Sequence, residues 1–409
     1  MSSNPSTLRA LVVSANYTDR LSYYDDWKAA FLASPQFEVE LFNIVGGDAA
    51  RRLRPALKGQ DAVILLHSTN GDTTRYLEPV APVLAERNCP LLTFVGNEVN
   101  LPGSPIGAKR AAFATIRPDY IATQLLPESG RYLFGDLAVR GVVALPHGLN
   151  PEVFHPQVPH GERSRDIGVR SVKYLAHLGD DDRNRVNDYF ARHEFAPDLT
   201  VDISTERFNR DGWARFLNDC RGTVSTEAGS WFIERDDATL EAIRAWTAAS
   251  EAGRGFVIAN DSPLRLLGHK LPFGWRRWLR QALSRGPIRH ESAVTESLAF
   301  DEVYKKFFAG RSIPEHHGKC ISSRHFDAIG TATCQILLEG RYNDILVPGV
   351  HYIRLASDFS NIAEVMETFR DERRRLEITE AALAHVMDSH TYAHRAAAVY
   401  GILTGGMPA

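Results

Sequence analysis

The sequence predicts an α/β protein of two domains, each built on a parallel sheet, and three observations lead to this prediction. The chain has 409 residues, more than one ordinary hydrophobic core accommodates. Hydrophobic residues make up 44% and charged residues 24% of the chain, as in globular proteins. Short apolar runs alternate with amphipathic stretches in two separate series along the chain, which indicates two α/β halves.

The first series occupies residues 1–150, for which we expect the N-terminal domain. Nearly continuous apolar strands separated by helices favour a parallel sheet covered on both faces. Ligands bind such sheets beyond the carboxyl ends of the strands, where this series carries polar residues, among them His67 and Glu98. The expected strands are Leu8–Ser14, Glu38–Ile44, Ala62–His67, Pro90–Val95 and Gly141–Leu145, and the expected helices are Tyr24–Leu32, Ala49–Leu57, Thr74–Arg87 and Pro105–Ala114.

A second domain is expected at residues 151–387, after a hinge at Leu145–Pro156 that is rich in proline and glycine. We expect an insertion at about 262–318 and helices over 363–400, the last of which (about 388–409) returns to the N-terminal domain. The expected strands are Ile167–Val169, Leu199–Ile203, Gly222–Thr226, Lys319–Ile321, Thr333–Leu338 and His351–Leu355, and the expected helices are Arg183–His193, Arg210–Asp219 and His325–Thr331.

Composition excludes several classes of protein. The balance of 47 basic and 50 acidic residues argues against a nucleic-acid binder. No charged segment followed by a long apolar run opens the chain, and no stretch of about 18 apolar residues occurs, so we expect a cytoplasmic protein without a spanning helix. The four cysteines fit neither a redox pair nor a zinc site, and we expect reduced thiols.

Residues 273–284 (FGWRRWLRQALS) predict an amphipathic helix with a basic face. Two interpretations stay open. The helix could pack on its own domain with a solvated basic face, or it could dock peripherally at the inner face of a membrane.

Three stretches carry motifs of one family. The helix start at residues 324–331 reads Arg-x-Phe-Asp-Ala-x-Gly-Thr, and Leu145–Pro156 and Asp202–Trp231 are similarly distinctive. Together they resemble group 1 glycosyltransferases, and within them the branch related to spore-maturation CgeB-type proteins. The resemblance spans about Leu91–Leu403. It implies the GT-B fold, in which two Rossmann-like domains face each other across a cleft and C-terminal helices close back, and it implies a nucleotide-sugar donor that is UDP- or GDP-linked.

The resemblance and the residues together indicate a donor site in the second domain. The positive end of the helix near His325 suits a diphosphate, which Arg324 could grip through two hydrogen bonds. Asp327 stands where the family usually has a glutamate on the ribose hydroxyls, and Lys319 stands where many retaining members have an acid. Structural alternatives stay open for these residues, namely helix capping, surface ion pairs, turns and solvated loops. The predicted donor-binding residues are Arg170, Lys173, Glu227, Gly229, Ser230, Lys319, Arg324, His325, Asp327 and Thr331.

The resemblance implies that the N-terminal domain binds the acceptor. In this domain Glu98 and His67 are the candidates for a general base or an acceptor contact, although either could be structural. The resemblance implies a retaining transfer to a glycan, lipid-linked or small-molecule acceptor, with no metal and no cofactor besides the donor. Asp180–Asp182 precede a helix that we expect them to cap. Two alternatives stay open. Lys319 and the absence of a glycine-rich first loop favour a non-catalytic nucleotide-sugar-binding protein, and the same fold also serves nucleotide-sugar epimerases.

Overall fold

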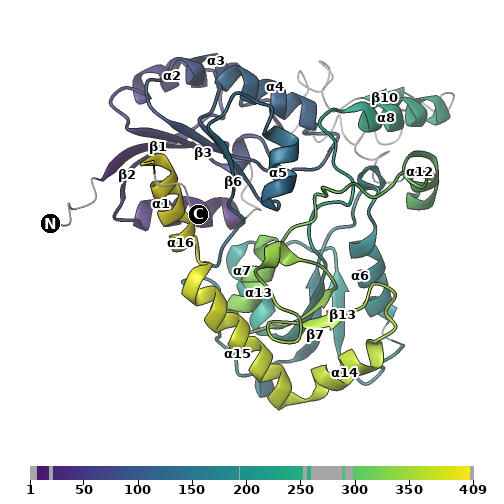
Figure 1. Cartoon of the computed structure of the whole chain (residues 1–409). Helices are drawn as coiled ribbons and strands as arrows, with labels where there is room; N and C mark the ends of the chain where they lie inside the picture. The colour runs from purple at the N-terminus through teal and green to yellow at the C-terminus, as the bar shows by residue number, and fades with distance from the viewer. Residues whose placement is uncertain are drawn as a thin grey trace.

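The computed structural model describes residues 7–17, 22–192, 194–251, 256–258, 288–290 and 298–405. Within these ranges the chain forms two α/β halves, each with a parallel sheet covered by helices (Figure 1). The predicted two-domain α/β fold is therefore confirmed. The predicted helix at 273–284 lies outside the described residues.

The first sheet has the strand order β2-β1-β3-β4-β5-β6, and every neighbouring pair is parallel. Alternate residues of β1 point to opposite faces of the sheet, and both sets are buried. Leu11 packs against the helices α2 to α5, and Val12 packs with Trp27 of α1. The strands are β1 (Leu8–Ser14), β2 (Phe37–Asn43), β3 (Ala62–Leu65), β4 (Leu91–Phe94), β5 (Tyr120–Thr123) and β6 (Gly141–Ala144), and the helices are α1 (Ser22–Ala33), α2 (Ala49–Ala56), α3 (Ala81–Ala85), α4 (Ile106–Ile116) and α5 (Pro127–Phe134).

Two sequence predictions for this half are wrong or incomplete. The single helix expected at Thr74–Arg87 is a 3-10 turn at Glu78–Val80 followed by the five-residue α3. Pro79 and Pro82 account for the break, because proline lacks the amide that a continuous helix needs. The strand β5 and helix α5 were not expected, because the apolar run of β5 is only Tyr120–Ala122 and α5 contains Ser129 and Gly130, which are weak helix formers.

The second sheet has the order β13-β12-β9-β7-β8, again fully parallel. The strand order reverses between β7 and β9, which is where parallel sheets bind ligands. The strands are β7 (Arg165–Arg170), β8 (Val201–Ser204), β9 (Cys220–Ser225), β12 (Cys334–Leu338) and β13 (Ile353–Leu355), and the helices are α6 (Asp182–Arg192), α7 (Arg210–Asn218), α8 (Ala238–Glu251), α12 (Phe300–Phe307), α13 (Ser323–Gly330), α14 (Ile362–Arg370) and α15 (Glu372–Ser389).

The strand expected at Lys319–Ile321 does not join this sheet. Cys320 instead makes an isolated antiparallel bridge with Ala228, so the segment forms part of the loops above the strand ends. Separately, β10 (Phe256–Ile258) and β11 (Ile288–His290) pair in parallel with each other.

The final helix α16 (Tyr392–Leu403) leaves the second half and packs on the first sheet (Figure 1). Its residues Tyr392, Ala396 and Val399 join the cluster around Trp27. The crossing is tied to the hinge, because Leu149 N–H donates to His390 O and Tyr392 N–H donates to Leu149 O, both at 2.9 Å. One face of the first sheet is thus completed by the last helix of the chain.

Candidate functional site

A cleft of about 980 Å³ lies between the two halves, lined by residues from both. Its first wall comes from loops that follow β1, β3, β4, β5 and β6, and its second wall comes from loops that follow β7, β8 and β9 and from the starts of α6 and α13. Both walls therefore lie beyond the carboxyl ends of parallel strands, where ligands are bound in such folds.

The second wall is basic. Lys173, Arg183, Arg207 and Arg324 line it, and the described residues on this side of the cleft include no Asp or Glu. Arg183 and Arg324 each occupy the second residue of a helix, α6 and α13. The positive end of a helix dipole adds to side-chain charge at such positions. This wall is suited to an anion with several oxygens, such as a diphosphate.

The guanidinium groups of Arg183 and Arg324 make weak contacts with neighbouring side chains. Arg324 donates to the Ser171 hydroxyl at 3.4 Å, and Arg183 lies 3.9 Å from the centre of the Tyr174 ring. Burial, and then the nearby Arg183 charge, lowers the pKa of Arg324 to about 10. Arg324 thus stays cationic at neutral pH, and an incoming anion would relieve the repulsion between the two guanidinium groups.

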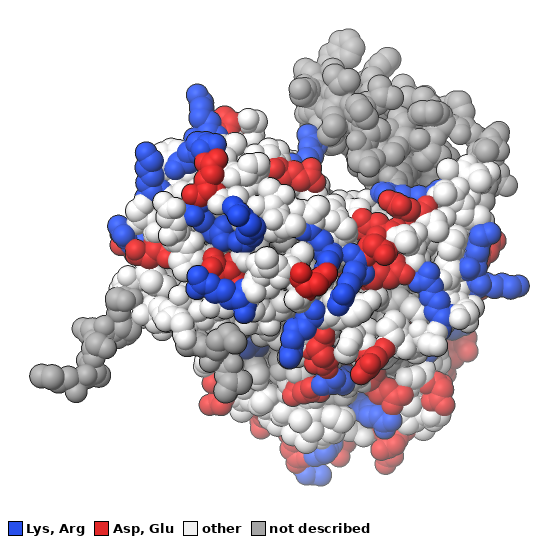
Figure 2. All heavy atoms as spheres, turned by 45° about the horizontal axis from the view of Figure 1, so that its top comes forward, with Lys and Arg blue, Asp and Glu red and all other residues white. Residues whose placement is uncertain are grey.

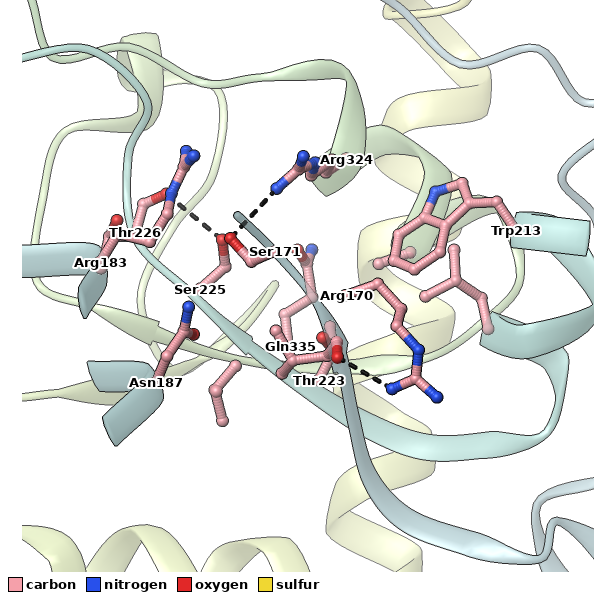
Figure 3. A pocket seen from close by; sticks show the side chains of 14 residues that line it. Arg170, Ser171, Arg183, Asn187, Trp213, Thr223, Ser225, Thr226, Arg324 and Gln335 are labelled. Atoms are coloured by element: carbon pink, nitrogen blue, oxygen red, sulfur yellow. Dashed lines mark hydrogen bonds between the residues drawn. The ribbon is translucent and has the colours of Figure 1, made fainter. Parts of the chain in front are cut away.

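A smaller recess of about 20 Å³ opens beside the cleft, and Arg183 and Arg324 line both (Figure 3). Gln335 of β12 faces this recess and is only 2% exposed. Neither its amide oxygen nor its amide nitrogen has a hydrogen-bond partner among the described residues. The amide therefore offers a donor and an acceptor to a water molecule or a ligand group that enters the recess.

The first wall is acidic and polar, and Glu98 is its most buried charged residue. Glu98 accepts hydrogen bonds from the Thr123 hydroxyl and from Gln124 N–H, the latter at 2.9 Å. Burial raises its pKa to about 7. Glu98 can therefore exchange a proton near neutral pH, which suits a group that contacts or deprotonates a hydroxyl.

The loop that carries Glu98 is fixed from behind. The ammonium group of buried Lys109 donates to the carbonyl oxygens of Gly96, at 2.9 Å, and Asn97. Asn97 has φ +50°, a left-handed conformation that asparagine tolerates better than most residues. Lys109 thereby holds the two residues that precede Glu98 in place.

Four of the predicted site residues line the cleft: Glu98, Lys173, Gly229 and Arg324. Gly229 has φ +91°, and an added Cβ would lie 1.7 Å from the carbonyl oxygen of Gly318. Only glycine fits there, and its N–H donates to the Tyr174 hydroxyl at 3.0 Å. Arg170 borders the recess, but its guanidinium is engaged by Asp202 at 2.8 and 2.9 Å.

Lys319 lies behind the wall and does not line the cleft. Its ammonium group contacts Asp180 at 2.8 Å and Asp182 at 3.1 Å, and the side chains of Lys319 and Asp180 are almost fully buried. Asp180 and Asp182, two of the three acids that were expected to cap α6, therefore bind this lysine. Asp180 also accepts the Asp182 N–H at 3.2 Å. Lys319 ties the loop before α13 to the start of α6, which positions Arg183 and Arg324 relative to each other.

The remaining predicted donor residues are buried in contacts within the second half. Asp327 accepts a hydrogen bond from the Trp213 indole N–H at 3.0 Å, and burial raises its pKa. His325 Nδ1 accepts Ser322 N–H at 3.0 Å as part of the α13 cap. Other contacts join Glu227 to Tyr342 N–H at 2.7 Å, Ser230 to Leu178 O at 2.6 Å, and Thr331 to Thr333 at 2.9 Å.

His67 lies in the core of the first half and does not itself line the cleft. Its ring stacks on Phe94 at 4.7 Å and on His147 at 5.0 Å, and the residue is 1% exposed. Burial and the neighbouring His147 hold its pKa well below the ordinary value. Of the two acceptor-side candidates, the structure brings only Glu98 to the cleft.

Several cleft residues were missed by the sequence analysis: Tyr17, Asp72, Gln124, Arg183 and Arg207. For Arg183 a signal existed, because it follows the β7 loop at a helix start, as Arg324 does at α13. The polar residues of the first wall belong to loops whose proximity depends on the sheet order, which the sequence does not display.

Among the described residues, no three His, Cys, Asp or Glu side chains converge as metal ligands would. The described helices also include none that is long and apolar enough to cross a membrane.

Comparisons with known proteins agree with this architecture. Residues 240–401 match the family model described as Glycosyl transferase-like. HepE from Anabaena in complex with UDP-glucose superimposes with a TM-score of 0.51 at 9% identity, covering 97% of this chain and 100% of HepE. HepE in complex with UDP gives 0.51 at 8% identity, with the same coverage. A comparison with curated protein sequences finds no match. The likeness establishes the GT-B fold for this chain.

Proposed function

We propose that this protein is a glycosyltransferase that moves a sugar from a UDP- or GDP-linked donor to a glycan, lipid-linked or small-molecule acceptor. The observation that carries the proposal is the basic wall of the cleft, where Arg183 and Arg324 stand at two helix starts with Lys173 and Arg207 beside them. A nucleoside diphosphate is the part of the donor that needs such a wall. The match of residues 240–401 to a glycosyl transferase-like model supports the same conclusion.

In the proposed mechanism the basic wall stabilises the leaving nucleoside diphosphate. Negative charge grows on the phosphate oxygens as the sugar bond breaks, and donors already in place for that charge lower the barrier. Arg324, Arg183 and Lys173 can supply this stabilisation without a metal ion. We further propose that the transfer retains the anomeric configuration, as the resemblance to group 1 enzymes implies, with Glu98 contacting the acceptor hydroxyl from the opposite wall.

A second candidate function is nucleotide-sugar binding without turnover. The burial of Lys319 between Asp180 and Asp182 favours it, because the position at which many retaining members have an acid is occupied by a structural cation.

One experiment separates the candidates. Purified protein is screened by thermal shift against UDP, GDP and their sugar conjugates, because a ligand that binds only the folded chain raises its melting temperature. The donor that binds is then incubated with and without acceptor extracts. Hydrolysis or transfer supports the transferase, binding without either supports the binding protein, and an isomerised sugar formed without acceptor indicates an epimerase.

For location, we propose the cytoplasm, with peripheral docking at the inner membrane face through residues 273–284. The test compares flotation with anionic liposomes for the parent and for a variant with Arg276, Arg277 and Arg280 changed to Glu. Equal flotation contradicts docking through this segment.

A further inference from the structure

On the wall opposite the basic one, Asn97, Tyr17 and Gln124 direct most of their side-chain hydrogen-bond donors to other protein groups. Asn97 donates both N–H groups of its side chain, to Gly71 O and to Asp72 Oδ1, each at 3.1 Å. Tyr17 donates its hydroxyl to Asp72 Oδ2 at 3.0 Å. Gln124 donates one amide hydrogen to Val95 O at 2.9 Å. These three side chains therefore use four of their five N–H and O–H hydrogens within the protein.

What this wall has left to offer is mainly acceptor oxygens. A side-chain amide has one oxygen and two hydrogens, and because both hydrogens of Asn97 are engaged, its side-chain oxygen is the group that remains to bond a ligand. The oxygen of Gln124 and the carboxylates of Asp72 and Glu98 add to it.

No Lys or Arg lines the first wall within the part of the chain that the structure describes. Lys109, the lysine that contacts the Glu98 loop, is fully buried and directs its ammonium group to the backbone carbonyl oxygens of Gly96 and Asn97. An anionic group on this side would meet the Asp72 carboxylate and the Glu98 carboxyl group and no Lys or Arg among the first-wall residues, which disfavours it.

We propose that the acceptor substrate presents hydrogen-bond donors to this wall and carries no phosphate or carboxylate at its reacting end. Hydroxyls of a neutral sugar or the ammonium group of an amino sugar meet this requirement, because both donate to acceptor oxygens. The inference rests on the proposed function, and it narrows the acceptor to neutral or cationic polyhydroxylated molecules.

The test uses the full chain saturated with the nucleoside diphosphate that binds it, so that the basic wall is occupied. Four matched probes are compared by ligand-detected NMR and by transfer from the donor: methyl glucoside, methyl glucosaminide, methyl glucoside 6-phosphate and methyl glucuronide. The expected result is binding or transfer for the first two that exceeds that of the last two at least tenfold. Equal or stronger binding of the phosphate or the uronate, or binding of none of the four, overturns the proposal.

Two variants test whether the charge of Asp72 contributes to the preference between the probes. Asp72→Asn removes one exposed charge of the wall and should lower the preference for the amino sugar over the phosphate about threefold, the scale expected of an exposed charge. Glu152→Gln removes an exposed carboxylate outside the cleft lining and should leave the ratio unchanged. An unchanged ratio in Asp72→Asn contradicts the role given to this wall. Donor binding and turnover are measured separately, so their failure would refute the proposed function and not the selectivity of the wall.

Discussion

The two walls of the cleft carry opposite charge and hold it by different means. On the second wall, Arg183 and Arg324 stand at helix starts with few protein partners, so their charge faces the cleft. On the first wall, Asp72 and Glu98 are engaged by neighbouring donors. The second wall is therefore suited to bind an anion. The side chains of the first wall are already hydrogen-bonded, so this wall offers a ligand mainly acceptor oxygens.

The largest expected effect concerns Lys319, which supports the second wall from behind. Lys319→Met should lower the free energy of unfolding by about 3–5 kcal/mol, because it leaves Asp180 buried without its cation. Urea denaturation measures this change, and Asp182→Asn should cost less because Asp182 is the more exposed partner. A Lys319→Met protein of unchanged stability that had lost donor binding would place Lys319 on the wall itself.

The next effect concerns Arg324. Arg324→Ala should weaken donor binding about 10- to 100-fold, the scale of a charge-assisted hydrogen bond of about 1.5–3 kcal/mol, as measured by calorimetry. Arg373→Ala, which removes an exposed arginine paired with Glu377 on α15, is the matched control. Asp327→Asn should change donor affinity much less, because Asp327 contacts Trp213 and does not line the cleft. Equal losses of donor affinity in Arg324→Ala and Asp327→Asn would show that Asp327 also takes part in donor binding.

A smaller effect is expected on the first wall. Glu98→Gln should lower transfer about tenfold with donor affinity unchanged, since it removes a charged hydrogen-bond acceptor. Because burial raises the pKa of Glu98 to about 7, transfer by the parent should rise with pH through 7, and the variant should lose this rise. A fall of 10²-fold or more, together with inversion at the anomeric carbon, would instead make Glu98 a general base.

The same shift has a consequence for stability. A carboxyl group whose pKa is raised on folding favours the folded state in its protonated form, so its contribution is present at low pH and is lost as the pH rises through about 7. The neutral Glu98→Gln protein should therefore melt higher than the parent above pH 7 and similarly below pH 5. Melting curves at the two pH values measure the difference, and a parallel change at both would contradict it.

The smallest effect is an expected absence of change. We predict that EDTA treatment leaves transfer unaltered, because Lys173, Arg183, Arg207 and Arg324 can neutralise the diphosphate. Recovery of lost activity by Mg²⁺ or Mn²⁺ would mean that the cations of the second wall are insufficient.

The sequence predicted the strands well where the apolar run was long, as at β1, and missed β5, whose apolar run is only Tyr120–Ala122. Of the site it predicted Arg324, because a contiguous motif carries it. It did not predict that Lys319 would pair with Asp180, since 139 residues separate the two and only the folded sheet brings them together. Much of the first wall was missed for the same reason, because Tyr17, Asp72 and Gln124 come from three separate loops.

The crossing of α16 to the first sheet has a consequence for how the chain matures on the ribosome. The half that is synthesised first lacks the cover for one face of its sheet until Tyr392–Leu403 emerges, whereas all described strands of the second half have by then been made. Until that moment Trp27 and Phe31 lack part of their apolar surroundings. The domain that is synthesised first is therefore the last to complete its hydrophobic core.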